Sequence, residues 1–305
     1  MVCELTDSAS AARLRRLPAH LAAHIRGQPE ALEIVASVLT RGELGLTSPR
    51  RPKGSFLFIG PTGVGKTETV NVFTDYLFGA LPIRFDMSEY QLQHSVDKLI
   101  GGSRDDRGLL GCAVLAAQRG ILLFDELEKA HPLVLDLFLQ ILEDGRITLA
   151  TGESVDVRPF YVVFTSNIGS REVMGMASPP FSSVKRTVLM RASQQLRPEL
   201  YGRITEKVVF ARLDYLTQRA VCEQMVAAEC ARLSELGHAI RVAPEALEFL
   251  VREGYHKTLG ARPMRGAIER HLQEAIASAL LSGGPARGLA TITAARDRLA
   301  LNPAA

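Results

Sequence analysis

The chain has 305 residues, of which 47% are apolar and 23% charged, with a formal net charge of +3. This is the composition of an ordinary globular protein, and because its lysines and arginines are scattered, the charge balance does not argue for a nucleic-acid partner, and none is expected. No apolar run approaches the roughly 18 residues of a membrane helix, and the N-terminus MVCELTDSAS does not resemble a signal peptide. We expect a soluble, cytoplasmic protein with no membrane insertion.

The first two hundred residues alternate between helical and strand-like patterns. Residues 1–17 are interpreted as a leader, and residues 18–40 have helical apolar spacing on either side of a break at Gly27. Helical stretches then separate short apolar runs, which predict an α/β domain with a mostly parallel five-stranded sheet. These five runs are residues 56–59, 82–85, 121–124, 161–164 and 207–210.

From about residue 212 the pattern becomes mainly helical. Residues 213–237 and 244–282 are rich in Ala, Leu, Glu and Arg, and residues 289–301 alternate as a terminal hairpin does. We therefore predict three parts: a leader (1–17), a large α/β nucleotide-binding domain (18–211) and a small, mainly helical C-terminal lid (212–305).

A phosphate-binding motif follows the first apolar run. It has the pattern GxxxxGK[ST] between a predicted strand and a predicted helix. Its glycines let backbone N–H groups converge on phosphate oxygens. Lys66 adds a positive charge, and the Thr67 hydroxyl is a ligand for Mg²⁺. The predicted nucleotide-binding residues are Gly60, Pro61, Thr62, Gly63, Val64, Gly65, Lys66 and Thr67.

Two acidic residues end the third apolar run. Buried charges are costly without partners, so Asp125 and Glu126 need a reason to be there. After a phosphate-binding loop, Asp125 is expected to hold Mg²⁺ and Glu126 to polarise the attacking water. The alternative is an N-cap pair for the helix that begins near Leu127. An acidic pair also disfavours a small-molecule kinase.

Three further residues are candidates for contacts with the γ-phosphate. Asn167 follows the fourth run, where its amide can bind the γ-phosphate or the lytic water, although asparagine also forms turns. Arg203 and Arg262 are the basic candidates, because phosphoryl transfer benefits from a cation near the γ-phosphate. Taken alone, each arginine is more often a surface residue.

With these motifs in place, the chain resembles an AAA+ ATPase of the Clp/ClpB type, and most closely the second ATPase module of ClpB-like disaggregases, here standing alone. The resemblance covers about residues 18–302. The blocks that carry it are IRGQPEAL, RPKGSFLFIGPTGVGKTE, RFDMSEY, ILLFDELEKAHP, LQILEDGRIT, FTSNIGS, LRPELYGRI and GYHKTLGARPMRGAIER.

The resemblance implies a role for each candidate. Lys66 and Thr67 match the Walker A pair, and Asp125 and Glu126 match the Walker B pair. Ile25 falls in the stretch that contacts adenine. Three residues complete the set: Asn167 matches sensor 1, Arg203 the arginine finger that reaches the ATP of the neighbouring subunit, and Arg262 sensor 2. A finger acting between subunits implies a ring, and the family assembles as hexamers.

The chain also departs from the family pattern. The finger segment is Gly202-Arg203-Ile204-Thr205 where the family has Asn-Arg-Ile/Leu-Asp. Met174-Gly175-Met176 is either the tripeptide that binds a protease partner or an apolar loop that packs locally. After Leu99-Ile100-Gly101 the family has a Gly-aromatic-Val-Gly pore loop. This chain has GSRDDRG, and nothing between Gln91 and Leu123 is aromatic.

These observations lead to one principal hypothesis and two alternatives. We expect Mg²⁺-dependent ATP hydrolysis by a homo-hexameric ring that remodels a dedicated protein partner. The first alternative is a ClpB- or ClpA-like unfoldase that threads polypeptides, gripping them by other loops such as residues 146–153. The second is an assembly scaffold controlled by nucleotide, with little turnover. Aromatic rings supply the contact area that grips any sequence, and the Arg-Asp-Asp-Arg cluster lacks it.

Overall fold

The chain folds into two compact units in a computed structural model. Its described residues are 8–174, 180–282, 288–295 and 298–303. The large unit comprises residues 1–60 and 65–211, and the small unit comprises residues 61–64 and 212–305. Residues 61–64 of the phosphate-binding motif therefore belong to the small unit, whereas residues 60 and 65–67 belong to the large unit.

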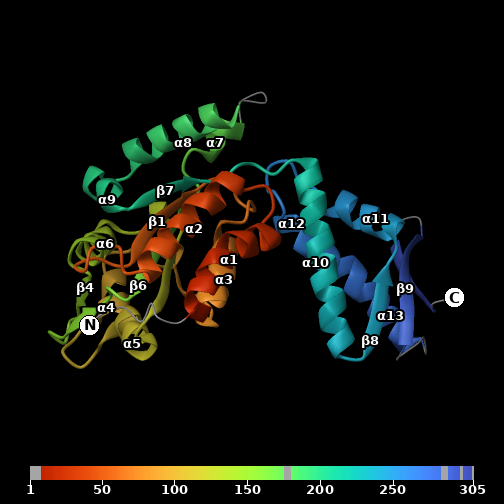
Figure 1. Ribbon diagram of the computed structural model, residues 1–305, viewed down its shortest axis with the longest axis horizontal. Helices are drawn as coiled ribbons and strands as arrows, with labels where there is room; N and C mark the ends of the chain where they lie inside the picture. Colours follow the sequence, from red (N-terminus) through yellow and green to blue (C-terminus); the bar gives the residue numbers. More distant parts are fainter. Residues whose placement is uncertain (1–7, 175–179, 283–287, 296–297, 304–305) are drawn as a thin grey trace. The chain divides into compact units, whose positions relative to one another are not determined.

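A five-stranded parallel sheet forms the centre of the large unit (Figure 1). Its strand order is β2-β3-β6-β1-β7. Each of the five predicted apolar runs overlaps one strand, so the predicted mostly parallel sheet is confirmed. The strands are β1 (Gly54–Ile59), β2 (Ile83–Asp86), β3 (Gly120–Asp125), β6 (Phe160–Ser166) and β7 (Glu206–Val209).

Helices cover both faces of this sheet, which is why its central strands are apolar at almost every position. Successive residues of β1 face opposite ways: the Phe56 ring lies near Phe73 of α3, whereas Leu57 joins the cluster that contains Phe138 of α6. The helices are α1 (Ser8–His24), α2 (Pro29–Glu43), α3 (Lys66–Phe78), α4 (Ser95–Ile100), α5 (Gly108–Ala117), α6 (Pro132–Asp144), α7 (Ser170–Met174), α8 (Phe181–Gln195) and α9 (Pro198–Arg203).

Short elements complete the connections of the large unit. The 3₁₀ turns η1 (Met87–Glu89) and η2 (Leu127–Lys129) follow β2 and β3, and an antiparallel hairpin pairs β4 (Arg146–Thr148) with β5 (Ser154–Asp156). Both 3₁₀ turns therefore lie at the carboxyl edge of the sheet, where parallel sheets bind ligands.

The N-terminal segment differs from the sequence-based expectation. Residues 8–17, assigned to a leader, form the first part of α1, and Leu17 and Leu21 of this helix are fully buried. Arginines surround the few apolar residues here, so the local pattern resembles a polar segment. The predicted break at Gly27 is confirmed: α1 ends at His24, α2 begins at Pro29, and Gly27 has a φ of 73°.

The small unit packs helices against a three-stranded sheet of order β10-β9-β8. The predicted terminal hairpin is confirmed by the antiparallel pair β9 and β10, whereas the parallel strand β8 was not predicted. Its elements are α10 (Tyr215–Glu235), β8 (His238–Val242), α11 (Pro244–Gly254), α12 (Arg262–Ala267), the π-helical turn η3 (Ile268–Gln273), α13 (Glu274–Leu281), β9 (Gly288–Ala295) and β10 (Arg298–Pro303).

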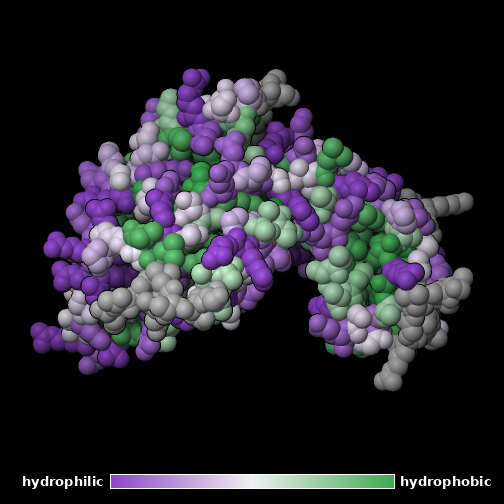
Figure 2. All heavy atoms as spheres, in the orientation of Figure 1, coloured by the Kyte–Doolittle hydropathy of each residue, from purple (hydrophilic) through white to green (hydrophobic). Residues whose placement is uncertain are grey.

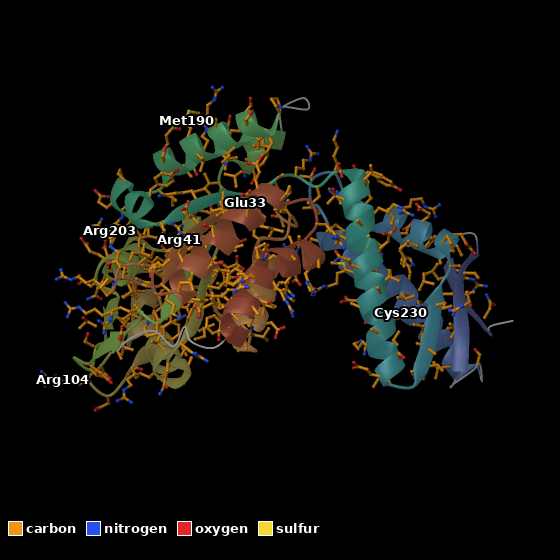
Figure 3. The ribbon with its side chains drawn as sticks, viewed as in Figure 1. Glu33, Arg41, Arg104, Met190, Arg203 and Cys230 are labelled. Atoms are coloured by element: carbon orange, nitrogen blue, oxygen red, sulfur yellow. The ribbon has the colours of Figure 1, made fainter. Side chains whose placement is uncertain are left out.

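Two cysteines lie on α10, and both are free thiols. Burial raises the pKa of Cys222 to about 12 and also raises the pKa of Cys230 (Figure 3), so both thiols stay protonated at neutral pH. Among the described residues, no helix combines the length and apolar character that crossing a membrane would need.

An aromatic cluster fills the core beside β3. The Phe124 ring centroid lies 5.6 Å from Phe85, 4.4 Å from Phe138 and 5.6 Å from Phe164. These four residues come from β2, β3, α6 and β6, and Phe124 immediately precedes Asp125. Packing of this ring therefore fixes the end of the strand that carries the acidic pair.

Phe124→Ala should destabilise the large unit, because it deletes a fully buried ring at the meeting point of four elements. We expect the free energy of unfolding to fall by about 3–5 kcal/mol. Leu81→Ala is the matched control, since Leu81 is 78% exposed, and its effect should stay within about 0.5 kcal/mol. Urea denaturation followed by circular dichroism measures both, and equal midpoints for the two variants would contradict this packing.

Candidate functional site

Left-handed glycines shape the phosphate-binding motif between β1 and α3. Gly63 and Gly65 have φ values of 74° and 100°, which side chains with a Cβ rarely adopt. Gly65 is the residue immediately before α3, so the first N–H groups of that helix face the motif. Val64 is buried, while Thr62 and Thr67 are partly exposed. The local sequence thus folds as an anion-binding loop at a helix N-terminus.

Lys66 is buried at the start of α3 and connects the motif to the next strand. Its Nζ donates to the backbone oxygen of Gly60 at 2.5 Å and to Oδ1 of Asn167 at 2.9 Å. Burial lowers the pKa of Lys66 to about 8, against the opposing attraction of Glu128, Asp125 and Glu126. The predicted Walker A lysine and the predicted sensor 1 asparagine are therefore in direct contact.

Asp125 ends β3, and two polar side chains contact its carboxylate. The Thr165 hydroxyl donates to its Oδ1, and Arg84 of β2 pairs with its Oδ2 at 2.7 Å. These contacts compensate the burial of the carboxylate. The side chain makes no N-cap contact among the described residues, so its partners argue against the helix-capping alternative.

Glu126 has an unusual backbone conformation. Its φ of 58° and ψ of 51° lie in the left-handed region, which costs a residue other than glycine about 1–3 kcal/mol. Its N–H donates to Oγ1 of Thr165 at 3.1 Å, and its Oε2 lies 2.5 Å from Nζ of Lys129. Glu126 precedes η2 but provides no side-chain cap. These contacts hold the carboxylate in one orientation.

Asn167 directly follows β6, one strand along from β3. Its backbone N–H donates to Oε1 of Glu128 at 3.0 Å, while its side-chain oxygen accepts from Lys66. The amide therefore takes part in the polar cluster, beyond any contribution to the turn that follows.

Ile25 and Gln28 lie between α1 and α2, and Ile25 is close to the glycine loop. Ile25 is buried, and a Cβ built on Gly65 would lie 3.7 Å from its Cγ2. Gln28 is also buried and binds both backbone groups of Ala211, donating to its oxygen and accepting from its N–H at 2.8 Å each. The segment predicted to contact adenine is thus fixed next to the glycine loop.

Arg203 lies at the end of α9, where Glu143 of α6 holds it. Its Nη2 pairs with Oε2 of Glu143 at 2.8 Å, and its Nη1 donates to the backbone oxygen of Glu199 at 3.2 Å (Figure 3). Among the described contacts, none joins Arg203 to Lys66 or Asp125. The structure therefore does not bring this arginine together with the phosphate-binding residues of its own chain.

Arg262 opens α12 in the small unit, to which Pro61, Thr62, Gly63 and Val64 also belong. The N–H of Ala261 donates to the backbone oxygen of Gly63 at 3.0 Å. A Cβ on Gly63 would lie 3.0 Å from the backbone nitrogen of Arg262. The start of α12 is therefore adjacent to the tip of the glycine loop.

Several residues of this cluster were not predicted from the sequence. Arg84 and Thr165 contact Asp125, Glu128 binds Asn167, and Lys129 pairs with Glu126. These residues lie in the blocks RFDMSEY, FTSNIGS and ILLFDELEKAHP, which resemble the family and, in two cases, also contain predicted site residues. Membership in these blocks is the signal that could have identified them.

The donor set suits a hard cation bound together with phosphate. Asp125 and Thr67 offer a carboxylate and a hydroxyl, the ligand types that Mg²⁺ shares with nucleotide oxygens and water. Within the described part of the chain, no group of three or more His, Cys, Asp or Glu side chains could hold a metal ion. The residues present therefore fit a magnesium–nucleotide complex better than a metal bound by protein alone.

Comparisons with known proteins identify the family of the chain. The family described as the AAA domain (Cdc48 subfamily) matches residues 51–207, and the C-terminal, D2-small domain of ClpB protein matches residues 213–293. A closed-state cryo-EM reconstruction of Hsp104 with ATPγS and FITC-casein is similar to 97% of this chain, with a TM-score of 0.88 and 29% sequence identity, over 52% of that chain.

Curated relatives carry Clp names. The chain is 38% identical over 280 residues to the chaperone protein ClpB 2 of Nostoc sp. and 37% identical over 279 residues to the chaperone protein ClpB of Vibrio cholerae. It is also 38% identical over 301 residues to a ClpA homologue, an ATP-dependent Clp protease ATP-binding subunit, of Porphyra purpurea. These alignments cover 89%, 89% and 92% of this chain.

The same alignments cover 32%, 33% and 36% of the relatives, so the chain spans about a third of their length. The match is nevertheless continuous across both units. With an AAA domain followed by the small domain of ClpB, the chain belongs to the AAA+ family and is of the Clp/ClpB type.

Proposed function

We propose that this chain hydrolyses ATP with Mg²⁺ and that it works as a homo-hexameric ring that remodels a dedicated protein partner. One observation carries the proposal. Lys66 lies 2.9 Å from Asn167 and within electrostatic reach of Asp125 and Glu126, at the carboxyl edge of the parallel sheet. A buried cation beside acids and an amide, under a glycine loop, matches the charge distribution that phosphoryl transfer requires.

Each residue has a task in the proposed reaction. The backbone N–H groups of residues 60–67 and the Lys66 ammonium bind the phosphates, and Ile25 packs beside the base. Asp125 and Thr67 would hold Mg²⁺, which neutralises charge that develops on the phosphate oxygens. Glu126, which is oriented by its contacts with Thr165 and Lys129, accepts the proton of the attacking water. Asn167 fixes the position of Lys66.

Two arginines would complete the site. Arg262 approaches from the start of α12, beside Gly63. Arg203 acts on the nucleotide of the neighbouring copy. Within its own chain it contacts Glu143 and Glu199, and none of the described contacts joins it to the phosphate-binding residues. A residue supplied by the next subunit joins hydrolysis to relative motion of subunits. These roles, the parts 18–211 and 212–305 as domains, and a cytoplasmic location are components of the proposal.

The remodelling of a dedicated protein partner is inferred from the names of the relatives and from the segment between Gln91 and Leu123. Relatives of this chain are named chaperones, which favours a protein as the object remodelled. A dedicated partner is preferred over threading of any polypeptide, because no aromatic side chain lies between Gln91 and Leu123. The possible protease-binding tripeptide Met174-Gly175-Met176 lies partly outside the described residues.

Glu126→Gln should abolish turnover without abolishing nucleotide binding. The amide keeps the size of the side chain but cannot accept a proton, so we expect kcat to fall by about 10²–10⁴-fold, with little change in the Kd of a fluorescent ATP analogue. Glu68→Gln, at an exposed glutamate in the first turn of α3, is the control and should leave both values unchanged. Wild-type turnover in the E126Q chain would contradict the assignment, and an inactive wild-type chain would favour the scaffold alternative.

Nucleotide affinity should fall as the pH rises through about 8, the pKa to which burial lowers Lys66. Bound phosphate favours the ammonium form and raises this pKa, so binding takes up a proton above pH 8 and none well below it. We expect affinity to weaken by up to about tenfold per pH unit above 8. Titration calorimetry at pH 7 and pH 9, in buffers of different ionisation enthalpy, measures the proton uptake.

Lys66→Arg is the control for this pH dependence, because a guanidinium stays charged throughout the range. Its affinity, whatever its absolute value, should not change between pH 7 and pH 9. Equal proton uptake by the wild-type and K66R chains would show that another group titrates and would exclude Lys66 as the source.

A further inference from the structure

The loop between α4 and α5, residues 101–107, has an internally fixed shape. We call it the charged loop. Asp106 accepts from the backbone N–H of Gly102 at 3.1 Å and from that of Gly108 at 2.9 Å, and these two bonds lower the pKa of its carboxyl group. A single carboxylate thus joins the two ends of the loop.

Two glycines allow this closure. Gly101 and Gly108 have φ values of 92° and 66°. A Cβ on Gly101 would lie 1.8 Å from the backbone oxygen of Asp106, and a Cβ on Gly108 would lie 2.4 Å from that of Leu99. The two ends of the loop approach each other so closely that neither glycine position accepts a side chain. The conformation of the loop is therefore set before any partner binds.

The charged loop is also attached to the hairpin formed by β4 and β5. Arg107 pairs with Glu153 at 2.8 Å, and the N–H of Ala150 donates to the backbone oxygen of Ile100 at 2.9 Å. Between loop and hairpin lies a shallow cleft of about 380 Å³, lined by Arg104, Asp105, Arg107, Thr151 and Glu153.

Two charged residues of the charged loop have no partner among the described residues. Arg104 and Asp105 are exposed, and within the described residues neither has a hydrogen bond or an ion pair, whereas Asp106 and Arg107 are both used inside the fold. Figure 3 shows Arg104 at the outer end of the loop, extending away from the sheet. The loop therefore presents one free cation next to one free anion.

We propose that the charged loop joins neighbouring copies of this chain, with Arg104 of one copy paired to Asp105 of the next. The charges that line the cleft sum to zero, so an acidic partner would face Asp105 and Glu153, and a basic partner would face Arg104 and Arg107. A second copy brings the same pair and satisfies both charges at once. Because the loop is pre-shaped, little conformational entropy is lost on pairing.

The inference rests on the assembly in the proposed function, and charge reversal tests it. R104E places two acids opposite each other between copies, and D105K places two cations opposite each other. We expect each single variant to raise the concentration for half-maximal assembly in ATPγS about tenfold. The double variant R104E/D105K should assemble like wild type. Sedimentation velocity measures assembly, and R119E, at an exposed arginine after α5, is the control and should also assemble like wild type.

Mixing the two single variants is the decisive step. In an equimolar mixture, the acidic loop of R104E meets the basic loop of D105K, so assembly should recover. Rescue by mixing requires the loops to meet between chains, because a defect within one loop would persist in the mixture.

Three results would overturn the inference. If wild type assembles and hydrolyses ATP while both single variants assemble equally well, or if mixing gives no recovery, the charged loop does not join copies and the proposed function stands. If wild type does not assemble in ATPγS, both the inference and the proposed ring fail.

Discussion

A buried lysine among carboxylates is the constraint on which the rest of this structure depends. Taking the Lys66 ammonium out of water is costly, and its lowered pKa records that cost. Glu128, Asp125 and Glu126, at and just after the end of β3, offset it, and Asn167 accepts its hydrogen bond. A bound polyphosphate would complete the balance, which explains why a cation is held at this depth.

The fold supplies the positions that this balance requires. Parallel strands bring their carboxyl ends to one edge, so β1, β3 and β6 deliver the glycine loop, the acidic pair and the asparagine to neighbouring points. Phe124 locks β3 in the core, and the next two residues carry the chemistry. Glu126 has a left-handed backbone, which is held by contacts with Thr165 and Lys129. The charged loop achieves its fixed shape by other means, with glycines and Asp106.

The sequence predicts the sheet well because a strand with helices on both faces of the sheet is apolar throughout. The phosphate-binding motif is recognised by the spacing of its glycines. Short or pairwise features escape prediction. The strands β4 and β5 have three residues each, too few for a periodic signal. The ion pair of Arg84 with Asp125 joins residues distant in sequence, so no local pattern encodes it. In α1, Leu17 and Leu21 are fully buried among arginines and alanines, a pattern too weak to distinguish a helix from a leader.

The central claim is an ATPase site completed between copies, and subunit mixing tests it most directly. E126Q should be inactive because its own site lacks the proton acceptor, and R203A because it cannot supply the arginine to its neighbour. Random equimolar mixing pairs an intact Glu126 with an intact Arg203 at about a quarter of the seams. Steady-state ATP turnover should therefore return to about a quarter of the wild-type rate. The control R197A, at the residue just before α9, should stay active alone. A mixture as inactive as its components would contradict the account.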